Sequence, residues 1–242
     1  RFQQYNWTRR PIDAAALEGA AAVVHLAGEN VGNARWTRAK KARIHDSRVL
    51  GTRLLVDALS RLRAPPRVLL GASAVGYYGD RADEWVDETS PPGRGFLAEV
   101  CRAWEAEADR AADHGIRVAR YRTGLVLTPD GGALGRMLPP FRWGLGGRLG
   151  SGRQHQSWIT LHDLVRAYAH GLENDSIRGA VNAVSPTPIT NAELTRVLAR
   201  ALGRPALLPA PRLALRIGLG EFAGELVSSQ RVRPSVLERT GF

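Results

Sequence analysis

The apolar positions of this chain fall into runs typical of buried strands, separated by stretches with helical spacing. Residues 20–27, 68–75 and 116–121 are the three clearest strand-like runs. Apolar side chains recur every three or four positions over residues 37–62 and 96–112, which follow the first two runs. Near-continuous apolar strands alternating with amphipathic helices predict an α/β fold with a doubly wound parallel sheet covered on both faces.

The alternation continues beyond a Gly- and Pro-rich region at residues 123–152, which holds one short helical pattern at 133–138. We then expect a strand near 157–160, a helix at 162–172, a strand at 180–184 and a helix at 191–202. A Pro-rich break at 203–211 precedes the tail, residues 212–242. We interpret this tail as a small helical appendage.

Composition is typical of a globular protein without a membrane span. The chain has 242 residues, of which 44% are hydrophobic, enough for one large core. No uninterrupted apolar stretch reaches the length that a bilayer requires. The one cysteine, Cys101, lies within a helical pattern and cannot form an internal disulfide. We therefore expect a small buried apolar role for Cys101 and a reducing, cytoplasmic location.

The net charge of +11 raises the question of a nucleic-acid partner. Basic residues are spread along the whole chain, and the densest cluster, residues 35–43, lies on one predicted helix with no interleaved aromatic stacking platform. A solvated basic surface explains this pattern better than a nucleic-acid site. A phosphate-bearing cofactor explains part of the charge equally well, and we expect neither a nucleic-acid nor a membrane partner.

Polar and small residues lie at the ends of the predicted strands, and these residues are the candidates for a ligand-binding or catalytic site. In doubly wound sheets ligands bind at the carboxyl ends of the strands, so the segments after Ala27, Ala72 and Tyr121 should line one crevice. A serine at the end of the second run and two tyrosines that follow it could hydrogen-bond a substrate oxygen, namely Ser73, Tyr77 and Tyr78. The alternative is that Ser73 caps its own backbone.

Five motifs, taken in order, resemble a known family. They are LAGE at 26–29, SAVGYYG at 73–79, RTGLVLTPDGGAL at 122–134, LPPFRWGLGGRLGSGRQHQSWITLHDLVRA at 138–167 and VNAVSPTPITNAEL at 181–194. Together they are similar to the NAD-dependent epimerase/dehydratase-like branch of the atypical extended short-chain dehydrogenase/reductases, which has a human mitochondrial member. The similarity extends over nearly the whole chain.

The resemblance implies a Rossmann-type sheet of about seven strands with NADP or NAD along its carboxyl edge. The cofactor-side positions that it implies are Leu26, Ala27, Gly28, Glu29, Arg48, Thr52, Ser73, Thr123 and Gly124. For Arg48 and Thr52, an ordinary helix-surface role is equally open. Residues 1–122 would form part of the dinucleotide-binding region, and residues 123–211 would combine the substrate side with the last Rossmann elements.

Two departures from the family affect the expected chemistry. The glycine-rich phosphate turn is not in this sequence, and we expect it upstream of Arg1. The acid–base pair, a tyrosine with a lysine four residues later, should fall within residues 96–101, where neither occurs. Tyr77 or Tyr78 could then act as acid, and Glu29 or Glu99 as base.

The substrate side also departs from sugar-nucleotide enzymes, which usually place an arginine on the substrate diphosphate at the position of Gln156. This argues against a standard nucleotide-sugar substrate, although Arg153 could reach the same phosphate. The residues that we expect at the substrate are Met137, Trp143, Arg153, His155 and Trp158. The remaining histidines show no metal-ligand spacing, so no metal is expected.

Two functions remain open at this point. The first is an oxidoreductase or epimerase-like isomerase that uses NADP or NAD on an unknown small substrate. The second is an NAD(P)-binding regulatory or sensor protein without catalysis, which the missing tyrosine and lysine favour. Family analogy also implies a homodimer through the two long helices.

Overall fold

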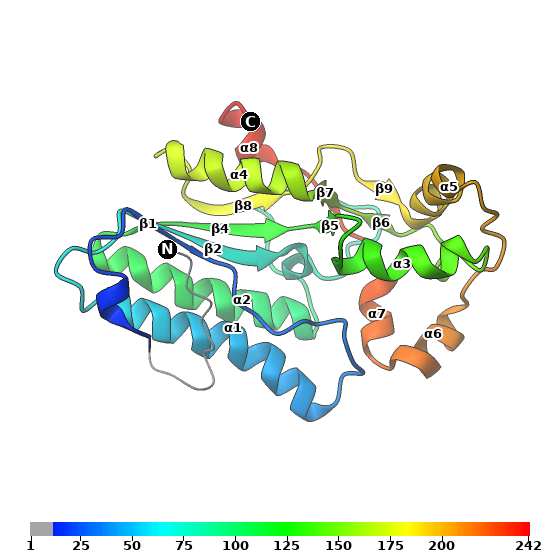
Figure 1. The fold of residues 1–242 in the computed structure, drawn as a ribbon, viewed down its shortest axis with the longest axis horizontal. Helices are drawn as coiled ribbons and strands as arrows, with labels where there is room; N and C mark the ends of the chain where they lie inside the picture. The colour runs from blue at the N-terminus through cyan, green and yellow to red at the C-terminus, as the bar shows by residue number, and fades with distance from the viewer. Residues whose placement is uncertain (1–11) are drawn as a thin grey trace.

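A parallel sheet forms the centre of the computed structural model, which describes residues 12–242 (Figure 1). Its strands lie in the order β1, β2, β4, β8, and every pair is parallel. They are β1 (Ala22–His25), β2 (Val68–Ala74), β4 (Arg117–Thr123) and β8 (Gly179–Ala183). The predicted α/β class with a parallel sheet is thereby confirmed.

Helices cover both faces of this sheet. In Figure 1, α1 (Arg38–Leu59) and α2 (Phe96–Asp109) lie below it, and α4 (Leu161–Glu173) and α8 (Ser235–Arg239) lie above it. Adjacent residues of β2 enter opposite cores: Leu69 packs with α1, whereas Leu70 packs on the α4 side. A strand buried on both faces needs apolar side chains at successive positions, which is why the sequence shows runs rather than alternation.

Local signals in the sequence fix the helix ends. Thr37 caps α1 by accepting a hydrogen bond from the backbone N–H of Lys40. At α5 (Asn191–Leu202) the side chains of Thr190 and Glu193 form a reciprocal capping box, and Gly203 ends the helix in a left-handed conformation. These caps explain why the predicted helix at 191–202 has the observed bounds.

A smaller lobe lies beyond the carboxyl ends of the main strands (Figure 1). Its helices are α3 (Gly132–Arg142), α5, α6 (Arg212–Leu219) and α7 (Phe222–Leu226). The short strands pair as β5 (Leu125–Leu127) with β7 (Trp158–Thr160), β6 (His155–Gln156) with β9 (Ile189–Thr190), and β3 (Trp85–Val86) with β10 (Arg231–Val232). Short 3-10 helices occupy Ala14–Ala16, Val75–Tyr78 and Arg110–His114. Within the described residues, no helix has the length and hydrophobicity of a membrane span.

The strand predicted near 157–160 lies outside the main sheet. It forms β7, which pairs with β5, and the described residues build a main sheet of four strands rather than about seven. Gly124 separates β5 from β4, and its backbone approaches Ser157 so closely that a Cβ atom would lie 2.4 Å from the Ser157 carbonyl oxygen. This contact brings β7 beside β5.

The interpretation of residues 212–242 as a helical appendage was incomplete. The tail does contain α6, α7 and α8, but it also contributes β10, and Val232 and Leu237 are buried in two different cores. Glu88 accepts hydrogen bonds from the backbone N–H groups of Val236 and Asn182, so it joins the tail to β8. The tail is therefore an integral part of the fold.

Candidate functional site

The candidate site is the edge where the four main strands end, at His25, Ala74, Thr123 and Ala183. Polar and small residues lie at these strand ends or directly after them, among them Gly28, Ser73 and Gly124. The segment that follows β1, residues 26–28, is exposed throughout. In parallel α/β sheets this edge is where ligands bind.

Side chains of α1 hold the segment after β1 in place. The backbone N–H of Glu29 donates to Ser47 Oγ (2.9 Å), and the Arg48 guanidinium donates to the Glu29 carbonyl oxygen (2.9 Å). Lys40 pairs with the Glu29 carboxylate at 2.5 Å, and this hydrogen bond lowers the carboxylate's pKa. Glu29 therefore has a partner that keeps it ionised, which disfavours it as a general base.

Gly28 allows a close approach beside Arg48. A Cβ atom at this position would lie 3.0 Å from the central guanidinium carbon of Arg48, which itself lies over the ring of Trp104 at 5.1 Å. The backbone of residues 26–28 thus presents a flat surface next to a fixed cation. A dinucleotide fits such a surface, because it needs close backbone contact and positive charge near its phosphates.

Thr52 lies in the interior, contrary to its prediction as a cofactor contact. Its hydroxyl accepts a hydrogen bond from Trp104 Nε1 (2.8 Å) and lies 3.0 Å from His25 Nε2, and its side chain is fully buried. It therefore links α1, α2 and β1. Burial lowers the pKa of His25 to about 4, so this imidazole is neutral in the folded protein.

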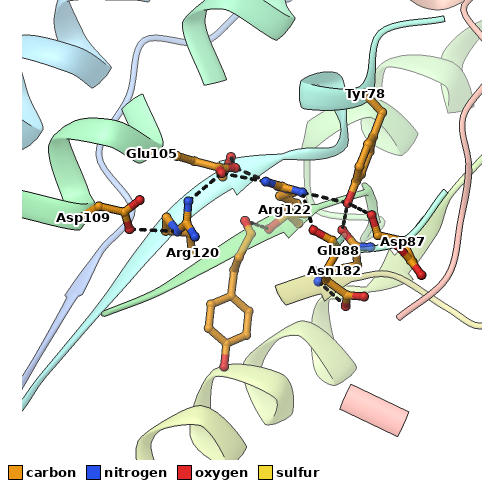
Figure 2. Close-up of polar contacts among 11 residues, drawn as sticks. Tyr78, Asp87, Glu88, Glu105, Asp109, Arg120, Arg122 and Asn182 are labelled. Carbon is orange, nitrogen blue, oxygen red and sulfur yellow. Dashed lines mark hydrogen bonds and ion pairs between the residues drawn. The ribbon is translucent and has the colours of Figure 1, made fainter. Parts of the chain in front are cut away.

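A chain of buried polar side chains crosses the main sheet near its carboxyl edge (Figure 2). Arg122 donates from Nε to Glu105 Oε1 (2.8 Å) and from a terminal nitrogen to Oε2 (2.9 Å). Its other terminal nitrogen donates to the Tyr78 hydroxyl at 3.0 Å. The Tyr78 hydroxyl in turn donates to Asn182 Oδ1 at 2.7 Å. The network thus connects α2, β4, the turn after β2 and β8.

Two of the predicted catalytic residues belong to this network. Ser73 donates its hydroxyl hydrogen to Glu105 at 2.6 Å, so its side chain points toward α2. Tyr78 is fully buried, and burial raises the pKa of its phenol to about 12. Both hydroxyls have partners within the protein, which disfavours Tyr78 as a proton donor at neutral pH, and the contact of Ser73 with a cofactor stays a prediction.

Tyr77 differs from its neighbour. The guanidinium of Arg122 lies 3.4 Å from the centroid of the Tyr77 ring, and Tyr77 meets Tyr78 edge-on with ring centroids 5.4 Å apart. Its side chain is half-buried, and among the described residues its hydroxyl has no hydrogen-bond partner. Of the three predicted catalytic side chains, Tyr77 alone has its hydroxyl unpaired within the part of the chain that the structure describes.

Apolar residues occupy the positions expected for the acid–base pair. Phe96 packs edge-on against Trp36, with ring centroids 5.1 Å apart, and Val100 is buried in the same cluster. Cys101 is buried as predicted, and burial raises the pKa of its thiol to about 12. The first turns of α2 thus contain neither the tyrosine nor the lysine of the usual pair, and Glu99 is the acidic residue there.

The predicted substrate residues are not gathered at one point. Met137 is partly buried and packs against an apolar cluster between α3 and α5. Trp158 Nε1 donates to the Thr187 carbonyl oxygen, and His155 Nδ1 lies 3.5 Å from Asp83 Oδ1. Trp143 is 80% exposed, and Arg153 is exposed as well. Their assignment to a substrate stays a prediction.

Sequence reasoning missed Glu105 and Asn182 and did not recognise Arg122 as the centre of a network. A usable signal was present in residues 116–121, because an arginine directly after a buried strand needs a partner carboxylate. The partner, Glu105, follows Trp104 on the apolar side of α2. Its distance along the chain hid the pairing.

Comparisons with known proteins agree with this geometry. The model of the NAD dependent epimerase/dehydratase family matches residues 1–183, and that of a domain of unknown function, DUF1731, matches residues 210–242. An epimerase family protein of Mycobacterium bovis is 47% identical over 232 residues, which are 96% of this chain and 76% of the relative. The human epimerase family protein SDR39U1 is 37% identical over 235 residues, 96% of this chain and 80% of the relative.

A solved structure of human SDR39U1 (isoform 2) with NADPH superposes with a TM-score of 0.88 at 35% identity, covering 95% of this chain and 79% of that one. MoeE5 in complex with UDP-glucose and NAD superposes with a TM-score of 0.75 at 20% identity, which shows a shared fold alone. The fold and family expectations are confirmed. This chain belongs to the NAD dependent epimerase/dehydratase family.

Proposed function

We propose that this protein binds NADP(H), or NAD(H), at the carboxyl edge of the main sheet and uses it to oxidise or reduce an unknown small substrate. Family membership supports the cofactor class, and human SDR39U1 was solved with NADPH. The observation that carries the proposal is the exposed backbone of residues 26–28 beside Arg48.

Each residue at this edge has a role that follows from its surroundings. Gly28 permits close contact, and Arg48 supplies a cation that its bond to the Glu29 carbonyl holds in place. Thr123 and Gly124 border the same edge at the end of β4. When bound, a nicotinamide accepts or donates a hydride, which is the chemistry common to oxidoreductases and epimerases of this class.

A proton-transfer group is still required for such chemistry. Tyr77 is our candidate, because its hydroxyl is unpaired among the described residues and its ring lies against Arg122. Ser73 and Tyr78 act as positioning residues, since their hydroxyls hold Glu105 and Asn182. A dinucleotide-binding regulatory protein is the second candidate, favoured by the absence of the tyrosine and lysine pair from residues 96–101.

The first test is a fluorescence titration of the full-length protein with NADPH and with NADH. We expect saturable binding, weakened about tenfold or more by Gly28→Val, because a branched side chain would cover the contact surface and displace Arg48. Gly131→Val is the matched control, since a side chain there meets nothing within 4 Å. Failure of both nucleotides to bind would refute the proposal.

The second test separates the enzyme from the regulator. Consumption of NADPH is followed in the presence of small carbonyl compounds, and Tyr77→Phe should lower turnover by about 10² or more while nucleotide affinity is unchanged. Turnover unaffected by Tyr77→Phe would refute the role of Tyr77. Nucleotide binding without turnover of any carbonyl compound would favour the regulatory function.

A cytoplasmic location and a homodimer belong to the same proposal. The single buried thiol, Cys101, is compatible with a reducing compartment. Leu50 and Leu54 leave apolar surface exposed on α1, one of the two helices through which the family analogy implies dimerisation. A monomer in size-exclusion chromatography would refute the dimer.

A further inference from the structure

Two stretches of the smaller lobe contain arginines but no acidic residue. Residues 131–162 contain four arginines and residues 194–220 contain five, and neither stretch contains an aspartate, a glutamate or a lysine. Within the described residues, none of these nine arginines forms an ion pair with a carboxylate. Their guanidinium groups therefore remain available to anions from outside.

Several arginines of the main sheet and its helices are neutralised by acidic partners within the protein. Arg122 and Arg120 pair with Glu105, and Arg53 and Arg110 pair with Glu107. Those arginines stabilise the fold internally. Among the nine arginines of the smaller lobe, Arg136 donates a hydrogen bond to the Gly32 carbonyl oxygen. No carboxylate of the same two stretches neutralises their charge, which is therefore available to an anionic partner.

The same lobe exposes large apolar side chains. Trp143 and Leu207 are each 80% exposed, Leu213 is 70% exposed and Ile217 is 68% exposed. Leu145, Val197 and Leu208 are further exposed members of the set. Single exposed apolar residues are common on soluble proteins, but seven in one small lobe indicate a surface that contacts an apolar phase.

Helix α6 shows the combination most clearly. It has eight residues and none of them is buried, so packing against the rest of the protein contributes little to its stability. Leu213 and Ile217 are four residues apart and lie on one face, and Arg212 and Arg216 precede each of them. A short amphipathic helix with leucine and isoleucine on one side and arginines beside them is typical of elements that lie in a lipid–water interface.

Segments that carry these residues are in direct contact. The backbone N–H of Ala210 donates to the Arg148 carbonyl oxygen (2.9 Å), and the N–H of Gly150 donates to the Ala210 carbonyl oxygen (2.8 Å). Arg148, Arg196 and Leu207 line one hollow between α5 and the segment that follows it. Figure 1 shows α3, α5 and α6 together at one end of the molecule.

We infer that this end of the protein docks on the surface of an anionic phospholipid bilayer. Leu207, Leu213 and Ile217 enter the interfacial region, and the arginines contact lipid phosphates. Trp143 suits the same depth, since indole rings favour the boundary between headgroups and acyl chains. The docking is peripheral and adds to the proposed dinucleotide binding without depending on it.

Other occupants fit the charge and the side chains less well. A second copy of this lobe would bring unpaired arginines against unpaired arginines, which repel each other. A nucleic acid would use the arginines but gains little from exposed leucine and isoleucine, because its bases stack on aromatic rings. The expectation of no membrane partner rests on the absence of a spanning segment, which does not exclude peripheral binding. The arginines are spread along the sequence, but the fold places two distant arginine-containing stretches together.

The test is co-sedimentation of the full-length protein with vesicles. Vesicles of phosphatidylcholine alone are compared with vesicles that contain about one third phosphatidylglycerol, at about 0.1 M and about 0.5 M salt. We expect binding to the anionic vesicles at the lower salt concentration. Arg212→Gln combined with Arg216→Gln should weaken it about 30-fold, since each arginine near an anionic surface contributes about fivefold.

Two control pairs make the result specific. Leu213→Ser combined with Ile217→Ser should weaken binding about tenfold or more, whereas Leu161→Ser combined with Val165→Ser on α4 should not. Arg61→Gln combined with Arg102→Gln removes the same charge elsewhere and should also leave binding unchanged. Circular dichroism and thermal unfolding verify that each variant is folded.

Three results of these experiments would overturn the inference of membrane docking. Absence of binding to anionic vesicles at low salt excludes the docking. Equal weakening by the control pairs would show a general charge effect rather than a surface at this end. Binding of a duplex or single-stranded oligonucleotide that the same variants abolish, without vesicle binding, would reassign the surface to nucleic acid.

Discussion

Arg122 on β4 and Glu105 on α2 form a doubly hydrogen-bonded ion pair between the main sheet and the helix that covers it, with N–O distances of 2.8 and 2.9 Å. Both side chains are almost fully buried. Loss of the Glu105 charge would leave the Arg122 guanidinium without compensation in a medium of low polarity, whereas Glu105 has a second ion pair with Arg120. The pair therefore makes the position of α2 dependent on β4.

Glu105→Gln tests this dependence. The substitution keeps the shape of the side chain but removes the charge opposite Arg122, so we expect the free energy of unfolding to fall by about 3 kcal/mol. Glu107→Gln is the matched control on the same helix, because its partners Arg53 and Arg110 are half exposed, and we expect a loss of about 1 kcal/mol or less. Urea denaturation measures both, and equal losses would contradict the structural role of the buried pair.

The adjacent tyrosines give a second prediction. Tyr78→Phe leaves Asn182 Oδ1 without its hydrogen-bond donor and leaves one nitrogen of Arg122 with only a long bond to the Glu88 carbonyl oxygen (3.4 Å), so the free energy of unfolding should fall by about 1–3 kcal/mol. Tyr77→Phe removes a hydroxyl that is unpaired among the described residues, and a change within about 0.5 kcal/mol is expected. If Tyr77→Phe proved the more destabilising variant in thermal or urea unfolding, the assignment of roles to the two tyrosines would be reversed.

The sequence predicted most of the elements, because their signals are local. The apolar run at 68–75 corresponds to β2 (Val68–Ala74), and the helix at 191–202 has the bounds that its capping box and Gly203 specify. Segment 157–160 was also recognised as a strand. The prediction that this strand belongs to the main sheet was wrong. The strand pairs with β5 instead, and this pairing depends on the close contact between Gly124 and Ser157.

Side-chain roles were less accessible, because their partners lie far away in the sequence. Ser73 looked like a site residue from its position at the end of an apolar run, but its partner Glu105 is 32 residues later. Tyr78 contacts Asn182, which is 104 residues later. A hydroxyl at a strand end can therefore face the site or the core, and only the fold decides which.

His25 predicts a dependence of stability on pH. Its pKa is lowered to about 4 in the folded protein from an ordinary value of 6.5, so between these values the unfolded chain binds a proton that the folded chain does not. Its contribution to stability is thus complete above pH 6.5 and is lost as the pH falls toward 4. We expect His25→Gln to show a shallower decline of the unfolding free energy over this range than the natural protein.

The carboxylates titrate in both proteins, so the difference between the two pH profiles isolates the histidine. His114→Gln serves as the control, because His114 is exposed. Its profile should parallel that of the natural protein in urea titrations at several pH values. A parallel profile for His25→Gln as well would show that the imidazole is accessible to protons in the folded state.

Gly124 gives the last prediction, which concerns how the main sheet meets the smaller lobe. A Cβ atom there would lie 2.4 Å from the Ser157 carbonyl oxygen and 2.9 Å from a methyl group of Val184, and the first contact is with backbone that cannot rotate away. Gly124→Ala should therefore lower the free energy of unfolding by about 2 kcal/mol or more and disturb the pairing of β5 with β7. Gly224→Ala in α7 meets nothing within 4 Å and should stabilise the protein by up to about 1 kcal/mol, because alanine favours helices. Thermal unfolding compares the two, and a neutral Gly124→Ala would mean that β7 can move away from β4 at little cost, so that the carboxyl edge of the sheet is less firmly enclosed than this contact implies.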